Sequence, residues 1–228
     1  QPPSAPNPTT TTTTTTSFAF PPHYSFPAFF TLQPVLATRH SQLTSWSTLI
    51  QTYCRHHHLF TLSLIDALPT PLFTNAALPR ALSLRDARVV ISWMASVEGG
   101  SRAEWMPTTT TTEAAAAKKK SSSAGAGAAG ADGGAGAGAA ADEDDGAGAK
   151  CWIYWRRPEE WAVVLEEWVE RTAQRGSVLT LYEITESDAT RREEFWGMEP
   201  ELLARSLGVC VKRGKAQIFG SEGSEGVK

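Results

Sequence analysis

Two low-complexity tracts decide how much of this 228-residue chain can fold. Residues 8–17 are nearly all threonine, and residues 107–149 consist of Thr, Ala, Gly, Ser and a few charged residues. Neither tract has enough apolar side chains to offset the entropy lost on ordering, so both are predicted to be disordered. The two remaining blocks, about 18–106 and 150–220, are rich in Trp, Phe, Leu and Val. Each block can form one modest core, and neither is long enough for a large enzyme domain.

The second block begins with an abrupt change from strand-like to helix-like sequence. Residues 151–155 are aromatic and β-branched, which favours a buried strand. Pro158 suits the first position of a helix, and the two glutamates after it suit the positive end of the helix dipole. We therefore predict a tight junction between two small domains. Its residues are Trp155, Arg156, Arg157, Pro158 and Trp161. The two arginines would fix this junction, and a solvent-exposed linker pair is the alternative.

Hydrophobic periodicity and turn residues predict the same element order in both blocks. The order is helix, strand, short helix, helix and a two-stranded hairpin. In the first block the expected ranges are 38–58, 59–64, 65–77, 83–98, 102–106 and 151–155. In the second block they are 158–172, 178–181, 182–186, 200–213, 215–219 and 227–228. Thr38 or Ser41 would cap the first helix, and Ser83 the third.

This order is that of a winged helix, so the predicted fold class is α+β, mostly α, with two tandem winged-helix domains. The disordered insertion lies in the first wing. The predicted boundaries are a Thr/Pro-rich tail at 1–17, an arm at 18–37, a first domain at 38–155 with its insertion at 107–149, and a second domain at 156–228.

The arm is rich in proline and aromatic residues and lacks helical or strand periodicity. We expect it to be extended and partly polyproline-like. It could lie across its own domain as a lid, or its rings could dock in the pockets of another protein. Pro21-Pro22-His23-Tyr24 also matches the PPxY pattern of WW-domain ligands. Both fates of the arm remain open at this point.

Several classes of chemistry lack their sequence signals. The Gly-Ala run has neither the lysine nor the flanking elements of a nucleotide site. The glutamate pairs at 159–160 and 166–167 are predicted on the solvent face of a helix, outside any cleft that acid–base catalysis would need. Cys54, Cys151 and Cys210 lie far apart in apolar patterns, which indicates buried free thiols in a reducing compartment. We expect a protein that is not an enzyme and has no cofactor or metal.

Charge and hydropathy also limit the partners. The net charge is −3, and the helices that a DNA-binding winged helix would use carry both signs of charge. Examples are Arg85 and Arg88 against Asp86 and Glu98. Protein–protein recognition is therefore favoured over nucleic acid, although fold alone does not decide this. The sequence contains no apolar run of the ~20 residues that a membrane span requires. We expect a cytoplasmic protein whose membrane contact is indirect.

Four segments resemble the vacuolar protein-sorting subunit 25 family, the small subunit of the ESCRT-II endosomal sorting complex. They are Phe26–Pro34, Pro71–Asn75, Trp155–Trp161 and Thr180–Glu183. The heptapeptide Trp-Arg-Arg-Pro-Glu-Glu-Trp is the most specific match. The resemblance runs from about Pro21 to the end, apart from 107–149, and that insertion is a departure from the family pattern.

The resemblance implies a non-enzymatic adaptor that recruits ESCRT-III during multivesicular-body sorting of ubiquitinated cargo. It implies two copies per complex and peripheral recruitment to the endosomal membrane. The arm would dock vacuolar protein-sorting proteins 22 and 36, the other ESCRT-II subunits. The expected contacts are Pro21, Pro22, Tyr24, Phe26, Pro27, Phe29 and Phe30.

The second winged helix would bind an ESCRT-III subunit, vacuolar protein-sorting protein 20 or charged multivesicular body protein 6. The expected contacts there are Val178, Leu179, Thr180 and Arg205. Two alternatives stay open, a winged-helix regulator that binds DNA and a WW-domain ligand that acts through the PPxY segment.

Overall fold

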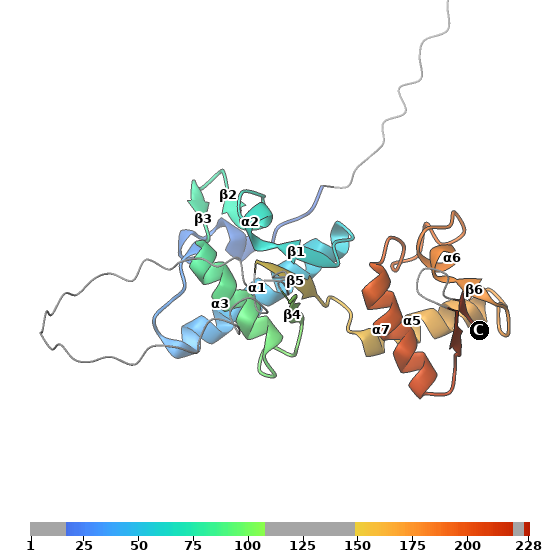
Figure 1. Cartoon of the computed structure of the whole chain (residues 1–228). Helices are drawn as coiled ribbons and strands as arrows, with labels where there is room; N and C mark the ends of the chain where they lie inside the picture. The colour runs from blue at the N-terminus through green and yellow to red at the C-terminus, as the bar shows by residue number, and fades with distance from the viewer. Residues whose placement is uncertain (1–16, 108–148, 221–225) are drawn as a thin grey trace, which may run out of the picture.

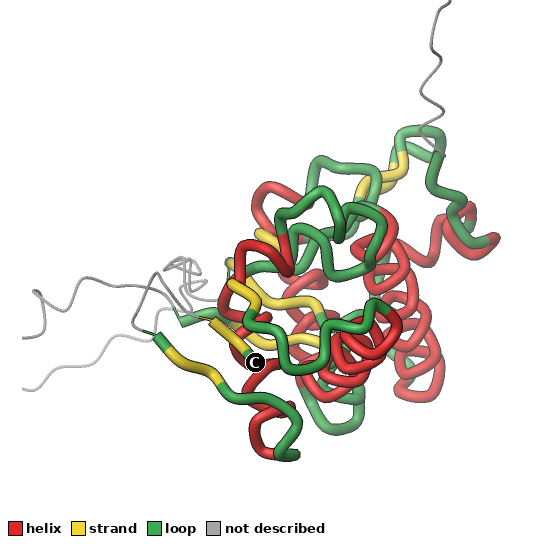
Figure 2. Tube along the Cα trace, turned by 90° about the vertical axis from the view of Figure 1, so that its right-hand side faces the viewer, coloured by secondary structure: helices red, strands yellow, loops and turns green. Residues whose placement is uncertain are grey.

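The computed structural model describes residues 17–107, 149–220 and 226–228, and it shows two successive units joined by a short link (Figure 1). The predictions of disorder for 1–17 and 107–149 fall almost entirely outside the described residues. The described chain contains much more helix than strand, and its strands are short (Figure 2). This mixture agrees with the predicted α+β class.

Within the described residues, the first unit contains three α-helices and a small antiparallel sheet. Its elements are α1 (Leu36–His56), β1 (Thr61–Ser63), α2 (Leu64–Ala67), β2 (Thr74–Asn75), β3 (Arg80–Ala81), α3 (Leu84–Ala95), β4 (Ala103–Trp105) and β5 (Lys150–Ile153). The sheet order is β1-β5-β4, and β2 pairs separately with β3. The predicted hairpin is confirmed, with Glu104 opposite Trp152. Ser83 caps α3 as predicted, because its hydroxyl accepts a hydrogen bond from the Asp86 amide at 3.0 Å.

The second unit repeats this order without a counterpart of β2 and β3. Its elements are α5 (Pro158–Arg171), β6 (Leu179–Thr180), α6 (Leu181–Thr185), α7 (Pro200–Lys212), β7 (Ile218–Phe219) and β8 (Gly226–Val227). The sheet order is β6-β8-β7, so the last strand again lies between the other two. Pro158 is the first residue of α5, as its sequence position predicts.

Three local predictions are wrong. The arm contains two short 3₁₀ helices, η1 (Pro22–Ser25) and η2 (Pro27–Phe30), instead of an extended chain. Residues 71–77 form a turn and β2, because the helix already ends at Ala67 and the Thr70 hydroxyl donates to the Ala67 carbonyl. The first helix begins at Leu36, two residues before Thr38, and Val35 at the cap position has no polar side-chain atom.

The cores of the two units meet through aromatic residues. Trp46, Ile91 and Met94 are fully buried in the first unit, and Trp161, Phe195 and Leu203 in the second. Burying one such side chain stabilises the fold by about 1.5–3 kcal/mol. Phe60 of the first unit lies 6.1 Å from Trp161 of the second, measured between ring centroids. The hydrophobic core therefore continues across the link.

Two glycines give opposite predictions for stability. A Cβ at Gly99 would lie 2.0 Å from the Trp93 carbonyl oxygen, so Gly99→Ala should destabilise the protein by about 2 kcal/mol or more. A Cβ at Gly208, inside α7, would meet no atom of the described chain within 4 Å. Gly208→Ala should stabilise the protein by about 0.5–1 kcal/mol because alanine favours helix. Urea unfolding measures both variants, and equal effects would contradict this reading of the turn at Gly99.

Candidate functional site

The arm lies across its own unit and is anchored by Tyr24. The Tyr24 hydroxyl is within hydrogen-bonding distance of the carbonyl oxygens of Pro71 and Thr74, the latter at 3.0 Å. The Asn75 side-chain amide donates to the Tyr24 carbonyl at 2.9 Å. Burial, and to a lesser degree Tyr53, raises the pKa of Tyr24. Tyr24 is 7% exposed, so this side chain serves the fold of the chain itself.

A second anchor holds the chain at Phe29. Its ring stacks on Trp46 at 4.3 Å between centroids, and the Trp46 indole N–H donates to the Phe29 carbonyl at 3.1 Å. The Gln42 side-chain amide donates to the same carbonyl at 2.8 Å and to the Thr31 carbonyl at 3.0 Å. Phe30 is also buried and lies edge-on to Trp46. Of the two fates left open by the sequence, the structure therefore shows self-packing for Tyr24, Phe29 and Phe30.

The sequence alone does not identify the residues that hold the arm. Gln42 is buried although it is polar, and its Oε1 accepts from the Gln33 amide at 3.0 Å. A signal was present, because Gln42 stands one helical turn before Trp46 and so shares the apolar face of α1. Asn75 had no comparable signal, since its partner is 51 residues away in sequence.

The other predicted arm contacts remain open to solvent. Phe26 is 63% exposed between the two 3₁₀ helices, Pro22 and Pro27 are exposed, and Pro21 is half-buried. An exposed phenylalanine next to a proline, as Phe26 is next to Pro27, is suited to insertion into a partner's pocket. A partner can reach these residues with the arm in place, whereas Tyr24 of the PPxY segment is covered. A WW domain could engage Tyr24 only after the arm leaves its unit.

The predicted junction residues lie together between β5 and α5. The Trp155 indole N–H donates to the Leu59 carbonyl at 3.1 Å, and its ring meets Trp161 edge-on at 4.9 Å. The Arg156 Nε donates to a Glu194 oxygen at 2.8 Å, and its guanidinium carbon lies 5.7 Å from the Trp161 ring centroid. Arg156 is thus a structural contact of the junction, which favours the first of the two interpretations for this residue.

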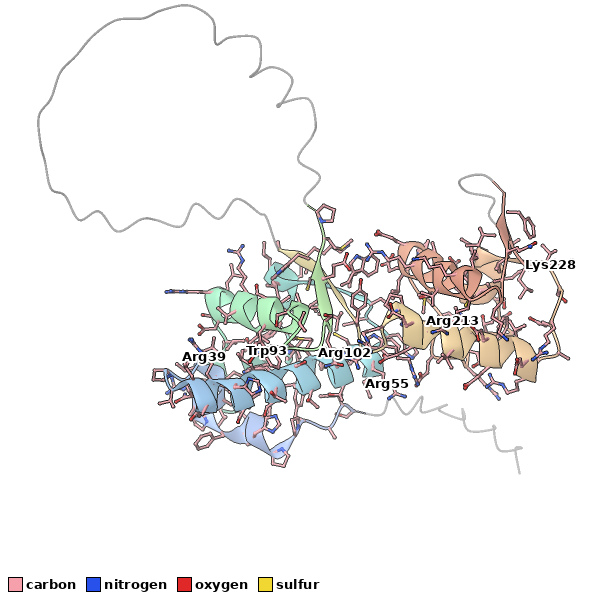
Figure 3. All side chains as sticks on the ribbon, turned by 90° about the horizontal axis from the view of Figure 1, so that it is seen from below. Arg39, Arg55, Trp93, Arg102, Arg213 and Lys228 are labelled. Atoms are coloured by element: carbon pink, nitrogen blue, oxygen red, sulfur yellow. The ribbon has the colours of Figure 1, made fainter. Side chains whose placement is uncertain are left out.

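Ion pairs join the two units on both sides of the link. Arg55, at the end of α1, pairs with Glu194 of the second unit. Arg102, just before β4, donates two hydrogen bonds to Glu160 of α5, at 2.9 and 3.2 Å. Arg55 and Arg102 are labelled in Figure 3, at the end of the first unit nearest α5. The Arg157 amide also donates to Glu160, at 2.8 Å. Glu160 and Glu194 of the second unit therefore each bind one arginine of the first unit and one of the link.

Arg205 belongs to this junction as well. Its guanidinium donates to both Glu104 oxygens at 2.9 Å and to the Tyr154 hydroxyl at 3.0 Å. It also pairs with Glu201 on its own helix. In Figure 1, α7 faces the first unit, whereas β6 lies on the far side of the second unit. The structure therefore separates Arg205 from the other three residues predicted for the ESCRT-III contact.

Those three residues lie at β6. Val178 is 57% exposed, Leu179 is half-buried against the core, and Thr180 caps α6. The Thr180 hydroxyl accepts from the Glu183 amide at 3.2 Å, and Glu183 accepts from the Thr180 amide at 2.7 Å. More large apolar side chains are exposed around this sheet, namely Tyr182, Ile218 and Phe219. We refer to Val178, Tyr182, Ile218 and Phe219 as the β6 patch.

The cysteines are buried free thiols, as predicted. Burial raises the pKa of Cys151 to about 12 and that of Cys210 to about 11, so both thiols are protonated at neutral pH. Within residues 17–107, 149–220 and 226–228, no three or more His, Cys, Asp or Glu side chains are grouped so that they could hold a metal ion. None of the helices in those ranges is long and apolar enough to cross a membrane.

Comparison with known proteins decides the family. A sequence model described as "ESCRT-II complex subunit" matches residues 23–199. The chain belongs to this ESCRT-II subunit family. Vacuolar protein-sorting-associated protein 25 of Danio rerio is 35% identical over 93% of this chain and 98% of its own length. The Homo sapiens protein of that name is 32% identical, over 93% and 97%. The resemblance found in the sequence is thereby confirmed, and the family consists of complex subunits, not of enzymes.

Solved structures of the same family share the fold. The crystal structure of subunit VPS25 of ESCRT-II matches with a TM-score of 0.65 at 22% identity, over 92% of this chain and 99% of that chain. The ESCRT-II complex structure with VPS22, VPS25 and VPS36 matches with the same score at 23% identity, over 91% and 97%. The mixed helix-and-strand architecture is therefore that of the ESCRT-II family.

The anchor at Phe29 can be tested with Gln42→Ala. This change removes one donor from each of three arm carbonyls, those of Ala28, Phe29 and Thr31, and we expect a loss of about 1–3 kcal/mol in the free energy of unfolding. Hydrogen exchange should accelerate in residues 26–33. Gln51→Ala is the matched control, because Gln51 lies on the same helix and bonds only to Ser47. Unchanged exchange in the arm of the Gln42 variant would contradict the anchor.

The ion pair between Arg102 and Glu160 should make the free energy of unfolding depend on pH. Burial alone would raise the pKa of Glu160, but hydrogen bonds from Arg102 and the Arg157 amide outweigh it and hold the pKa below its usual value. A carboxylate with a lowered folded-state pKa stabilises the protein above its unfolded-state pKa, and this is lost as the pH falls through the folded-state value. Glu160→Gln should therefore cost about 1 kcal/mol at neutral pH and less below pH ~4.

Urea unfolding at both pH values measures this difference. Glu167→Gln on the exposed side of α5 is the control and should change little at either pH. A Glu160 variant whose deficit stays constant down to acidic pH would show that the ion pair does not stabilise the junction.

Proposed function

We propose that this chain is a non-enzymatic subunit of an ESCRT-II complex. The match of residues 23–199 to the family carries this proposal. Its partners would be VPS22 and VPS36, the proteins that accompany VPS25 in the matched complex structure. The chain would act in endosomal trafficking, sorting ubiquitinated cargo into multivesicular bodies. We further propose that each complex contains two copies of this chain. The complex would be recruited from the cytoplasm to the periphery of the endosomal membrane, and the chain's own contact with the membrane would be indirect.

We interpret the two units as tandem winged-helix domains, over 38–155 and 156–228. The repeated element order and the repeated sheet order support this interpretation. In each unit the last two strands form the hairpin that would be the wing. The insertion at 107–149 would lie in the first wing, between β4 and β5.

The exposed part of the arm would dock the other ESCRT-II subunits. Phe26 would be the central contact because it is the most exposed ring of the arm, with Pro22 and Pro27 beside it. The buried residues Tyr24, Phe29 and Phe30 would hold Phe26 in position. Of the seven predicted residues, Pro22, Phe26 and Pro27 would then contact the partner, and the three buried aromatic residues would support them. Pro21, which is half-buried, belongs to neither group.

The β6 patch would bind the ESCRT-III subunit. Its side chains are exposed, and the sheet at β6 lies on the side of the second unit away from the first, where a partner could approach without touching the arm (Figure 1). A DNA-binding role is less well supported. Asp86 lies in the first turn of α3, next to the Arg85 and Arg88 that would have to meet phosphates.

A crossed experiment tests both contacts. Phe26→Ala should reduce co-purification with VPS22 and VPS36 by about tenfold or more, as expected for a buried aromatic contact, and leave ESCRT-III binding unchanged. Val178→Asp should do the reverse. Each variant is the control for the other, and both sites are exposed enough to spare the fold. If neither variant affected either partner, both surface assignments would be wrong.

A further inference from the structure

A second surface of the second unit lies at the other end of α6 from Thr180. A cavity of about 450 Å³ opens there, lined by residues that include Glu186, Trp196, Met198, Glu199 and Pro200. It is separate in sequence from the β6 patch, whose residues do not line it. The proposed function does not use it.

The backbone of this region holds Trp196 at the surface. Phe195 points into the core, where its ring meets Trp168 at 5.4 Å, so the next side chain in the turn points outward. Gly197 has φ 74°, which favours glycine, and its amide donates to the Thr185 carbonyl at 2.8 Å. The turn is thereby fixed to the end of α6. Trp196 is 37% exposed and forms one wall of the cavity.

The charges at the cavity are not compensated. Nearby glutamates are paired: Glu193 with Arg171, Glu194 with Arg55 and Arg156, and Glu201 with Arg205. Glu186 and Glu199 line the cavity, and no arginine or lysine of the described chain forms an ion pair with either. The positive end of α7 lies beside them but amounts to about half a charge, against two full carboxylate charges. The site is therefore net negative.

We propose that this cavity binds an arginine side chain of a partner protein. An indole and two carboxylates that line one cavity suit a planar guanidinium, which stacks on aromatic rings and donates hydrogen bonds to carboxylates in its own plane. A lysine would be bound less well because its ammonium is more strongly hydrated and lacks the planar face. The contact would add a charged anchor to the second unit, independent of the apolar β6 patch.

The indole N–H signals in the NMR spectrum of the full chain test this proposal. Trp196→Phe assigns the Trp196 signal. The probe is the capped tripeptide Ala-Arg-Ala, compared with the same peptide containing citrulline, which has the shape of arginine without its charge. We expect the arginine peptide to shift the Trp196 signal selectively and to bind at least about fivefold more tightly than the citrulline peptide.

Charge-removing variants complete the test. The double variant Glu186→Gln, Glu199→Gln should lower the affinity for the arginine peptide by about fivefold or more, to that of the citrulline peptide. Asp188→Asn is the matched control, since it removes an exposed charge from the same loop without altering the cavity. The other indole signals report that each variant remains folded. Equal shifts with both peptides, or equal effects of the control and the double variant, would overturn the proposal.

Discussion

The arrangement of the two units depends on the contact between Trp155 and Trp161, which only five residues separate in sequence. Only Arg156, Arg157 and Pro158–Glu160 separate the two rings in sequence, so the end of β5 fixes where α5 can begin. Phe60 packs against both rings, which extends the first core into the second. The ion pairs at Glu160 and Glu194 then act at the edges of this contact. Because such pairs are partly exposed, we regard them as setting the angle more than supplying stability.

The arm combines core residues with an exposed ring, Phe26, that we propose as a partner contact. Tyr24, Phe29 and Phe30 are buried, whereas residues 25–28 between them are exposed, so each 3₁₀ turn carries both kinds of position. Tyr24 and Phe29 are held by backbone carbonyls and by Gln42, Trp46 and Asn75, which leaves Phe26 outward on a fixed base. A docking ring that is already positioned loses less entropy on binding than one carried by a flexible tail. In the proposed function, self-packing would therefore support partner docking and would not compete with it.

Local patterns predicted much of the fold. The cap at Ser83 and the helix start at Pro158 depend on neighbours in sequence, and the hairpin joins β4 to β5, the next described strand in the chain. The 3₁₀ turns of the arm and the path of residues 71–77 depend on each other instead, through Tyr24 and Asn75, so periodicity could not predict them. The candidate sites divide in the same way. Exposure of Phe26 and pairing of Arg205 with Glu104 are set by residues far away in sequence, and no spacing rule shows which arginine meets which glutamate.

The hairpin of the first unit has a consequence for engineering. Trp105 lies opposite Cys151, and the Met106 amide donates to the Lys150 carbonyl at 3.0 Å, so the two strands stay paired up to the ends of the described chain on either side of the insertion. The entropy of closing a flexible loop grows only with the logarithm of its length, about 0.6 kcal/mol for each doubling. The chain between β4 and β5 is thus a natural attachment point. A fluorescent domain or affinity tag placed there would leave Phe26, the junction and the β6 patch free to report on assembly.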